Sequence, residues 1–154
     1  MPTAPRPGIG IFQRTLVVSF QVSGTLALTA PVWDGHNDVP IQLRSRYGNL
    51  LADFEFEDTA DTGPTSPEGR PMHTDLARLK QGMLGGQFWS VYVPGDYADS
   101  GYARVQLEQI DIARQMIAKY PRLEFAWSAA DVRRAFRRGR IASLIGMEGG
   151  HVIE

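Results

Sequence analysis

Two short motifs hold the residues whose types and spacing could do chemistry. Asp34, His36 and Asp38 stand two residues apart, and Glu148 precedes a pair of glycines. On a strand, a period of two sends side chains to the same face. Imidazole and carboxylate groups are ordinary ligands of zinc. The spacing is therefore compatible with a metal site at a strand end, and also with a purely structural histidine.

The elements that must position these motifs alternate along the chain from Val32 onward. Strands are expected at 31–33, 87–93, 123–127 and 141–147, with helices at 75–81, 102–120 and 129–138. The last strand is an almost continuous apolar run, which is typical of a strand buried on both faces. This order predicts parallel βαβ units with right-handed crossovers. Glu148 then follows a buried strand, where α/β folds place functional groups, although an ion pair or a helix N-cap is the other interpretation.

Local signals indicate where the helices begin and which face they bury. Thr74 is expected to cap the first helix, and Ser128 with Asp131 forms a capping-box-like start for the third. The second helix carries an apolar stripe at spacings of three and four: Ala103, Leu107, Ile110, Ala113, Ile117 and Tyr120. Glycines and prolines make 53–71 an irregular polar loop, either an active-site lid or a solvated insertion.

The other histidines and an arginine cluster favour structural roles. His151 lies close enough to Glu148 to be a ligand, but a loop hydrogen bond is the expected role. His73 precedes the Thr74 cap and is expected to lie away from the motif residues. The five arginines between 133 and 140 are expected to form the solvated side of a helix, with positive charge near its C-terminus.

The composition excludes several classes of protein. The 154 residues include 16 Lys and Arg and 17 Asp and Glu, a net charge of −1 that argues against nucleic acid or an anionic membrane as partner. The absence of cysteine excludes disulfides, thiolate zinc sites and cysteine nucleophiles. No stretch reaches the ~18–20 apolar residues of a membrane span. A soluble, cytoplasmic protein is expected rather than an exported one.

Residues 1–30 form a separate N-terminal region. Prolines and glycines indicate a flexible leader, and alternation at Leu16, Val18, Phe20 and Val22 predicts a β-hairpin before Ala30. A signal peptide is the other interpretation, but cleavage after Ala30 would put Leu28 where a small residue belongs.

Four motifs resemble the renal dipeptidase family, which comprises the membrane dipeptidases and their bacterial relatives. They are DGHND (34–38), GGQFWSVYVP (85–94), FRRGRIASLIG (136–146) and EGGH (148–151). The resemblance implies an α/β fold, the (β/α)₈ TIM barrel of the metal-dependent hydrolases, with about its first four strands in this chain. Such a barrel takes about 250 residues, so 31–154 is expected to be an incomplete catalytic domain, truncated at its C-terminus.

The resemblance also implies a metal centre and an activity. His36 and Asp38 match the pair that binds one zinc ion, and Glu148 matches the catalytic glutamate that bridges two zinc ions. Asp34 is expected to orient a ligand from behind. The remaining zinc ligands and the substrate-binding residues come from later strands, and nothing here matches them. The implied activity is hydrolysis of dipeptides through a hydroxide shared by the two metals.

Some interpretations stay open beside that one. The enzyme could be another amidohydrolase-type metal hydrolase, acting on a cyclic amide, a lactone or an acyl-amino acid. It could also be a non-catalytic half-barrel that binds a partner. The chain of 154 residues is expected to be inactive by itself. The expected partner is a dipeptide substrate, and a homodimer of the full-length protein is the other partner left open.

Overall fold

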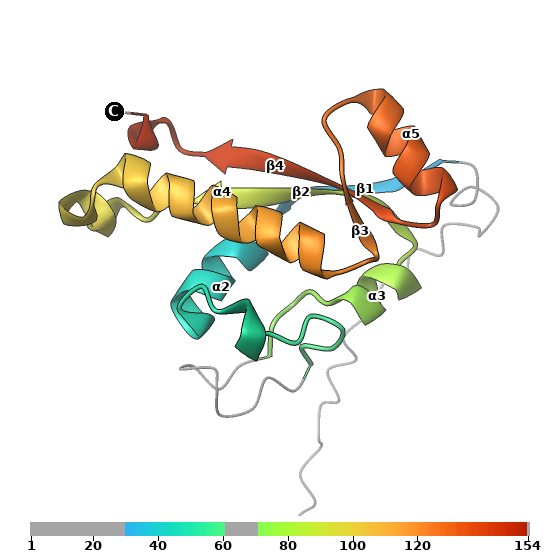
Figure 1. The fold of residues 1–154 in the computed structure, drawn as a ribbon, viewed down its shortest axis with the longest axis horizontal. Helices are drawn as coiled ribbons and strands as arrows, with labels where there is room; N and C mark the ends of the chain where they lie inside the picture. Colours follow the sequence, from blue (N-terminus) through green and yellow to red (C-terminus); the bar gives the residue numbers. More distant parts are fainter. Residues whose placement is uncertain (1–29, 61–70, 154) are drawn as a thin grey trace, which may run out of the picture.

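A parallel sheet of four strands organises residues 30–60 and 71–153, the residues that the computed structural model describes (Figure 1). The strands are β1 (Val32–Asn37), β2 (Leu84–Tyr92), β3 (Leu123–Phe125) and β4 (Ile141–Glu148). The helices are α2 (Val39–Tyr47), α3 (Leu76–Gln81), α4 (Tyr102–Lys119) and α5 (Ala129–Arg137), and the 3₁₀ turns are η1 (Leu51–Asp53), η3 (Gly95–Ser100) and η4 (Gly150–Val152). The predicted leader and hairpin lie, apart from Ala30, outside the described residues.

The sheet confirms the predicted parallel α/β architecture. Its order is β1-β2-β4-β3, so β4 lies between β2 and the short strand β3. β4 pairs with β2 along its whole length, from Gly86 opposite Ala142 to Tyr92 opposite Glu148. β3 has only three residues and pairs with the first three of β4. The long β2–β4 ladder therefore places Glu148 directly beside the end of β2.

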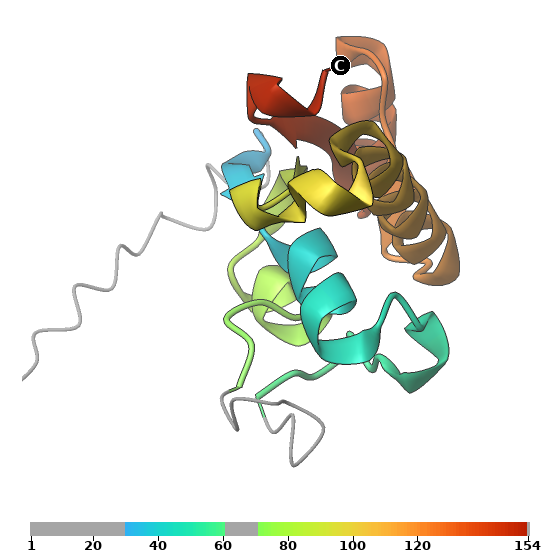
Figure 2. The same cartoon turned by 90° about the vertical axis from the view of Figure 1, so that its left-hand side faces the viewer.

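One hydrophobic core fills the space between the sheet and the helices α2, α3 and α4. Trp89 of β2 is fully buried at its centre, together with Leu43 of α2 and Met116 of α4. Figure 1 shows α4 running along the sheet with α2 and α3 beside it. Figure 2, turned by 90°, looks at the C-terminal ends of the strands and shows β1 leading directly into α2. This core is what fixes the strand ends relative to one another.

The apolar stripe predicted on α4 is correct in the second half of the helix only. Ala113 and Ile117 are buried as expected, but Leu107 is 67% exposed. In the first half the buried face carries Gln106 and Gln109 instead. The predicted stripe also passed over Val105, Ile112 and Met116, which are buried, so it was turned away from the true packing face.

The segment after η1 is irregular, as predicted, but it is not a solvated insertion where it is described. Phe54 and Phe56 are buried in the main core. The Tyr120 hydroxyl donates to the Phe54 carbonyl over 2.7 Å and accepts from the Phe56 N–H over 3.1 Å. Residues 61–70 lie outside the described ranges, so the lid interpretation stays untested.

The helix starts are confirmed in one case and corrected in another. The Ser128 hydroxyl accepts from the Asp131 N–H at the start of α5, as the capping box predicted. At α3 the cap is Asp75, one residue later than expected, because its carboxylate accepts from the Arg78 N–H. The Thr74 hydroxyl instead accepts from the Asn37 side chain over 3.0 Å.

β4 is buried on both faces only along its first half. Ile141 to Ser143 are buried, whereas Met147 is 52% exposed. β3 ends opposite Ser143, and within the described residues no further strand pairs with the rest of that edge. The apolar run therefore predicted the strand correctly but overstated its burial, and the exposed second half leads to Glu148.

Candidate metal centre

A bulge near the end of β1 sets the direction of His36. Asp34 stands opposite Gln87 and Asn37 opposite Trp89, so Gly35 and His36 together stand opposite Phe88 alone. Such an extra residue bends a strand and redirects its side chains, often beside an active site. The strict period of two is thereby interrupted between Asp34 and His36, so the spacing by itself no longer places these two side chains on a shared face.

Asp34 contacts His36 through the backbone and not through the imidazole. Its carboxylate accepts from the His36 N–H over 3.1 Å, and its own carbonyl accepts from the Gln87 side chain over 3.3 Å. Both contacts stabilise the bulge. The expectation that Asp34 orients a ligand stays a prediction. If Asp34 orients His36, it does so through the His36 N–H and not through the imidazole.

Asp38 stands at the start of α2, yet its carboxylate is not used to cap that helix. Asn37 takes part of this role, because its side-chain oxygen accepts from the Val39 N–H over 3.2 Å. Pro40 stands in the first turn of α2, where no N–H is required. The Asp38 carboxylate is thus left to approach His36, with its Oδ1 3.2 Å from His36 Nε2.

Glu148 is the last residue of β4 and reaches the same point from the other side of β2. Its Oε2 lies 3.3 Å from His36 Nε2 and accepts from the Ser90 hydroxyl over 2.8 Å. Three strands therefore contribute to one cluster: β1 with the residue that follows it, β2 and β4. His36, Asp38 and Glu148 therefore meet at the carboxyl ends of the strands.

The geometry of these three residues fits one metal ion. One ligand atom from each of His36, Asp38 and Glu148 lies within 4.8 Å of the other two. Ligands at about 2.0–2.2 Å from a tetrahedral ion lie roughly 3–4 Å apart. Small side-chain movements would therefore bring all three ligand atoms within bonding distance of one ion. Within residues 30–60 and 71–153, no second group of this kind is found.

The electrostatics of the cluster also favour a cation. The ion pairs that Asp38 and Glu148 make within the described ranges are both with His36. Two carboxylates therefore share a single imidazole, which is charged only when protonated. The side chains of His36, Asp38 and Glu148 are 54%, 50% and 46% exposed, so a metal ion can reach them from solvent.

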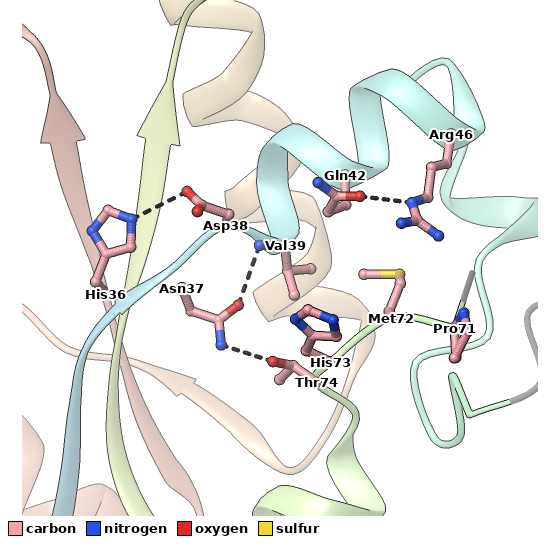
Figure 3. Close-up of a pocket in the computed structure, with 10 residues that line it drawn as sticks. All are labelled: His36, Asn37, Asp38, Val39, Gln42, Arg46, Pro71, Met72, His73 and Thr74. Carbon is pink, nitrogen blue, oxygen red and sulfur yellow. Dashed lines mark hydrogen bonds and ion pairs between the residues drawn. The ribbon is translucent and has the colours of Figure 1, made fainter. Parts of the chain in front are cut away.

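A hollow of about 310 Å³ adjoins the cluster on the α2 side (Figure 3). His36 and Asp38 line it together with Gln42 of α2 and His73 of the segment before α3. His73 was expected to lie away from the motif residues, and it meets them only as a lining residue of this hollow. It lies near because Asn37 donates to the Thr74 hydroxyl and holds the segment against β1. His73 does not belong to the three converging ligands.

His151 makes the loop hydrogen bond that the sequence suggested. Its Nε2 lies 2.9 Å from the Val93 carbonyl, and its ring packs edge-on against Tyr102. The ring also lies over Gly149, whose φ of +87° favours glycine and where an added Cβ would meet the ring at 2.5 Å. The chain after Glu148 is thus attached to the end of β2.

Comparison with known proteins decides the family. The chain matches the family described as membrane dipeptidase (peptidase family M19) over residues 22–154. The chain therefore belongs to the membrane dipeptidase family. This confirms the resemblance that the four motifs predicted.

Two curated members of the membrane dipeptidase family are similar to the chain over most of its length. Dipeptidase ataJ of Aspergillus terreus is 43% identical over 137 residues, which make up 83% of this chain and 31% of that protein. Dipeptidase 3 of Rattus norvegicus is 40% identical over 124 residues, 80% of this chain and 23% of that protein. The chain thus spans between about a quarter and a third of these relatives.

Solved structures support the fold. The structure of the dipeptidase AC, a metallopeptidase of family M19, matches with a TM-score of 0.55 and 26% identity, over 81% of this chain and 37% of that one. A metallopeptidase from Rhodobacter sphaeroides, solved with a phosphinate mimic of the dipeptide L-Ala-D-Ala, gives a TM-score of 0.55 and 22% identity, over 80% and 39%. Both agree with the partial barrel expected from the resemblance, and membership of a metallopeptidase family implies a metal cofactor.

Two further observations bear on the sequence predictions. None of the helices in the described ranges is long and apolar enough to cross a membrane.

Ser90 was not singled out from the sequence as a site residue. The sequence places Ser90 near the end of a predicted strand, and the register of β2 against β4 puts it on the face that Glu148 shares.

Proposed function

We propose that this chain supplies part of the metal centre of a zinc-dependent dipeptidase. The single observation that carries the proposal is the convergence of His36, Asp38 and Glu148 from two strand ends on one point. The curated relatives described above are both named dipeptidases, and the three residues stand in the motifs that first indicated the family. The proposed cofactor is a pair of zinc ions.

The donor set suits zinc. Zinc accepts imidazole nitrogen and carboxylate oxygen, and the chain has no cysteine to offer as an alternative. Glu148 has two oxygens, of which Oε2 lies 3.3 Å from His36 Nε2. The other oxygen can serve a second ion, which is how one carboxylate can bridge two metals. When bound, zinc supplies a Lewis acid that polarises a carbonyl group and makes water a better nucleophile.

The protein residues have separate roles in this proposal. His36 and Asp38 hold one metal at the end of β1, and Glu148 fixes its distance from the second. The bulge in β1 gives the imidazole its direction, and the Asn37 cap leaves the Asp38 carboxylate free to bind. All three ligands are about half exposed, so a substrate as small as a dipeptide can approach them from the open side.

The proposal is tested by hydrolysis of a dipeptide such as Gly-Leu. The protein is produced from the full reading frame that contains this chain, and release of free amino acids is followed with zinc, with a chelator, and in the variant Glu148→Gln. Asp111→Asn is the matched control, because Asp111 is an exposed acid on α4 whose carboxylate bonds only within its helix, to Gln115.

We expect hydrolysis that is lost with the chelator, returns with zinc, disappears in Glu148→Gln and is kept in Asp111→Asn. Hydrolysis that survives both the chelator and the Glu148 substitution would contradict the proposal. A zinc-loaded protein with no activity on any dipeptide would contradict the substrate assignment.

A further inference from the structure

The Ser90 hydroxyl touches the metal cluster without being one of its candidate ligands. Ser90 lies on β2 and is only 3% exposed. Its Oγ–H donates to Glu148 Oε2 over 2.8 Å, and the same oxygen lies 3.3 Å from His36 Nε2. One carboxylate oxygen of Glu148 is thus held between a buried hydroxyl and the imidazole.

The register of the sheet explains this contact. Tyr92 stands opposite Glu148 and Ser90 opposite Gly146, so Ser90 points to the face that Glu148 shares. Gly146 precedes Glu148 by two residues on this face and has no side chain to stand between Glu148 and the hydroxyl.

We propose that Ser90 is a positioning residue of the metal centre, which holds the Glu148 carboxylate in its metal-binding orientation. This inference rests on the proposed function. An ionised carboxylate offers about four lone-pair positions, so Oε2 can accept from Ser90 and still bind a metal ion. The hydrogen bond also fixes one rotamer of an exposed glutamate before the metal arrives.

Residues that orient a metal ligand have a measurable effect. Losing such an outer contact typically weakens metal binding by about 10–100-fold. Without its hydroxyl partner, the Glu148 side chain would be held by its contact with His36 alone, at the end of a strand whose last residues are exposed. Metal binding would then have to order that side chain, and the affinity would fall.

A purely structural serine would behave differently, and the chain contains one for comparison. Ser143 on the neighbouring strand β4 is also fully buried, and its hydroxyl donates to the Ile141 carbonyl of its own strand over 3.2 Å. Ser143→Ala therefore measures what the loss of a buried serine hydroxyl costs this sheet, away from the metal cluster.

The experiment measures the zinc affinity of the protein produced from the full reading frame that contains this chain, by competition with a fluorescent chelator. Wild type, Ser90→Ala and Ser143→Ala are compared, and the visible spectrum of bound Co²⁺ reports the ligand geometry. Thermal melting of each metal-free chain shows that all three are folded. We expect Ser90→Ala to bind zinc about 10–100-fold more weakly and to alter the Co²⁺ spectrum, with Ser143→Ala like wild type.

Two results would overturn the inference alone. Ser90→Ala could bind zinc as tightly as wild type, or Ser143→Ala could weaken binding by the same factor, which would make the effect a general one on the sheet. A wild-type chain that binds no zinc would overturn the proposed function as well, so the two failures are distinguishable.

Discussion

Two carboxylate clusters in this molecule have opposite surroundings. Asp75, at the start of α3, is almost fully buried and accepts from the N–H groups of Thr59 and Arg78. The Arg78 guanidinium adds a third bond over 2.8 Å. The cluster of His36, Asp38 and Glu148 is about half exposed. Its two carboxylates contact only the His36 imidazole and the Ser90 hydroxyl among the contacts within the described residues.

The pKa of Asp75 reflects its surroundings. Burial raises the pKa of this carboxyl, but the backbone N–H groups of Arg78 and Thr59 and the Arg78 guanidinium outweigh burial and hold it below its ordinary value. Every oxygen of Asp75 therefore serves to attach the segment before α3 to the rest of the fold. The difference between the clusters shows how to separate acids that stabilise a fold from acids that wait for a ligand: the first are matched by donors, and the second are not.

The largest effect on stability is expected from Asp75→Ala. The substitution leaves the Arg78 guanidinium without its buried partner and the Thr59 N–H without an acceptor. Because the Arg78 guanidinium is 42% exposed and keeps its bonds to Thr59 and Met72, the loss comes mainly from the buried Thr59 N–H and the lost cap of α3. Such losses typically cost about 1–3 kcal/mol in the free energy of unfolding. Urea denaturation measures the loss. Asp58→Ala, at an exposed acid in the same segment, is the control. An equal loss of unfolding free energy in this variant would show that the donors around Asp75 do not set it apart.

A smaller effect on stability, but a large one on metal binding, is expected from Glu148→Gln. The change removes one of two neighbouring negative charges that share His36, so the free energy of unfolding should stay the same or rise slightly. Zinc affinity should fall by more than the roughly 10–100-fold that outer contacts cost, because a direct ligand is lost. Titration of zinc alongside urea denaturation checks both parts. If the variant were destabilised and its zinc affinity unchanged, Glu148 would be an acid that stabilises the fold, like Asp75, and not a metal ligand.

The smallest effect is expected from Asp131, an exposed acid that is nevertheless matched by donors. The Ser128 hydroxyl, the Trp127 N–H and the Arg134 guanidinium lower its pKa to about 2. Because the pKa in the folded state lies below the unfolded value of about 3.9, its contribution is present above that pH and disappears as pH falls toward 2. Asp131→Asn should flatten this part of the curve of stability against pH. An unchanged curve would mean that exposure, and not donors, separates the two kinds of acid.

The sequence predicted which residues meet in the cluster better than it predicted the structure around them. His36, Asp38 and Glu148 were found because strand ends and family motifs mark them directly. The bulge at Gly35 and His36 was not predicted, because an extra residue in a strand leaves no trace in a period of two until the partner strand is known. Ser90 was missed for the same reason, since its contact depends on the register between β2 and β4.

The fold shows the same division between local and long-range information. The capping box of Ser128 and Asp131 fixed the start of α5, because it depends on neighbours in sequence. The place of β4 between β2 and β3 and the buried glutamines of α4 depend on packing between distant segments. The α2 helix was not predicted either, because its cap comes from Asn37 and its N-terminal turn is set by contacts with the segment before α3.

The central claim is that His36, Asp38 and Glu148 bind a metal together. The most direct test is a crystal structure of the chain grown with zinc, with an anomalous difference map calculated at the zinc absorption edge. We predict a peak about 2.0–2.2 Å from His36 Nε2 and from one oxygen each of Asp38 and Glu148, with the Ser90 hydroxyl still on Glu148. A map with no peak at this cluster, or with the peak at His73 or His151 instead, would contradict the account.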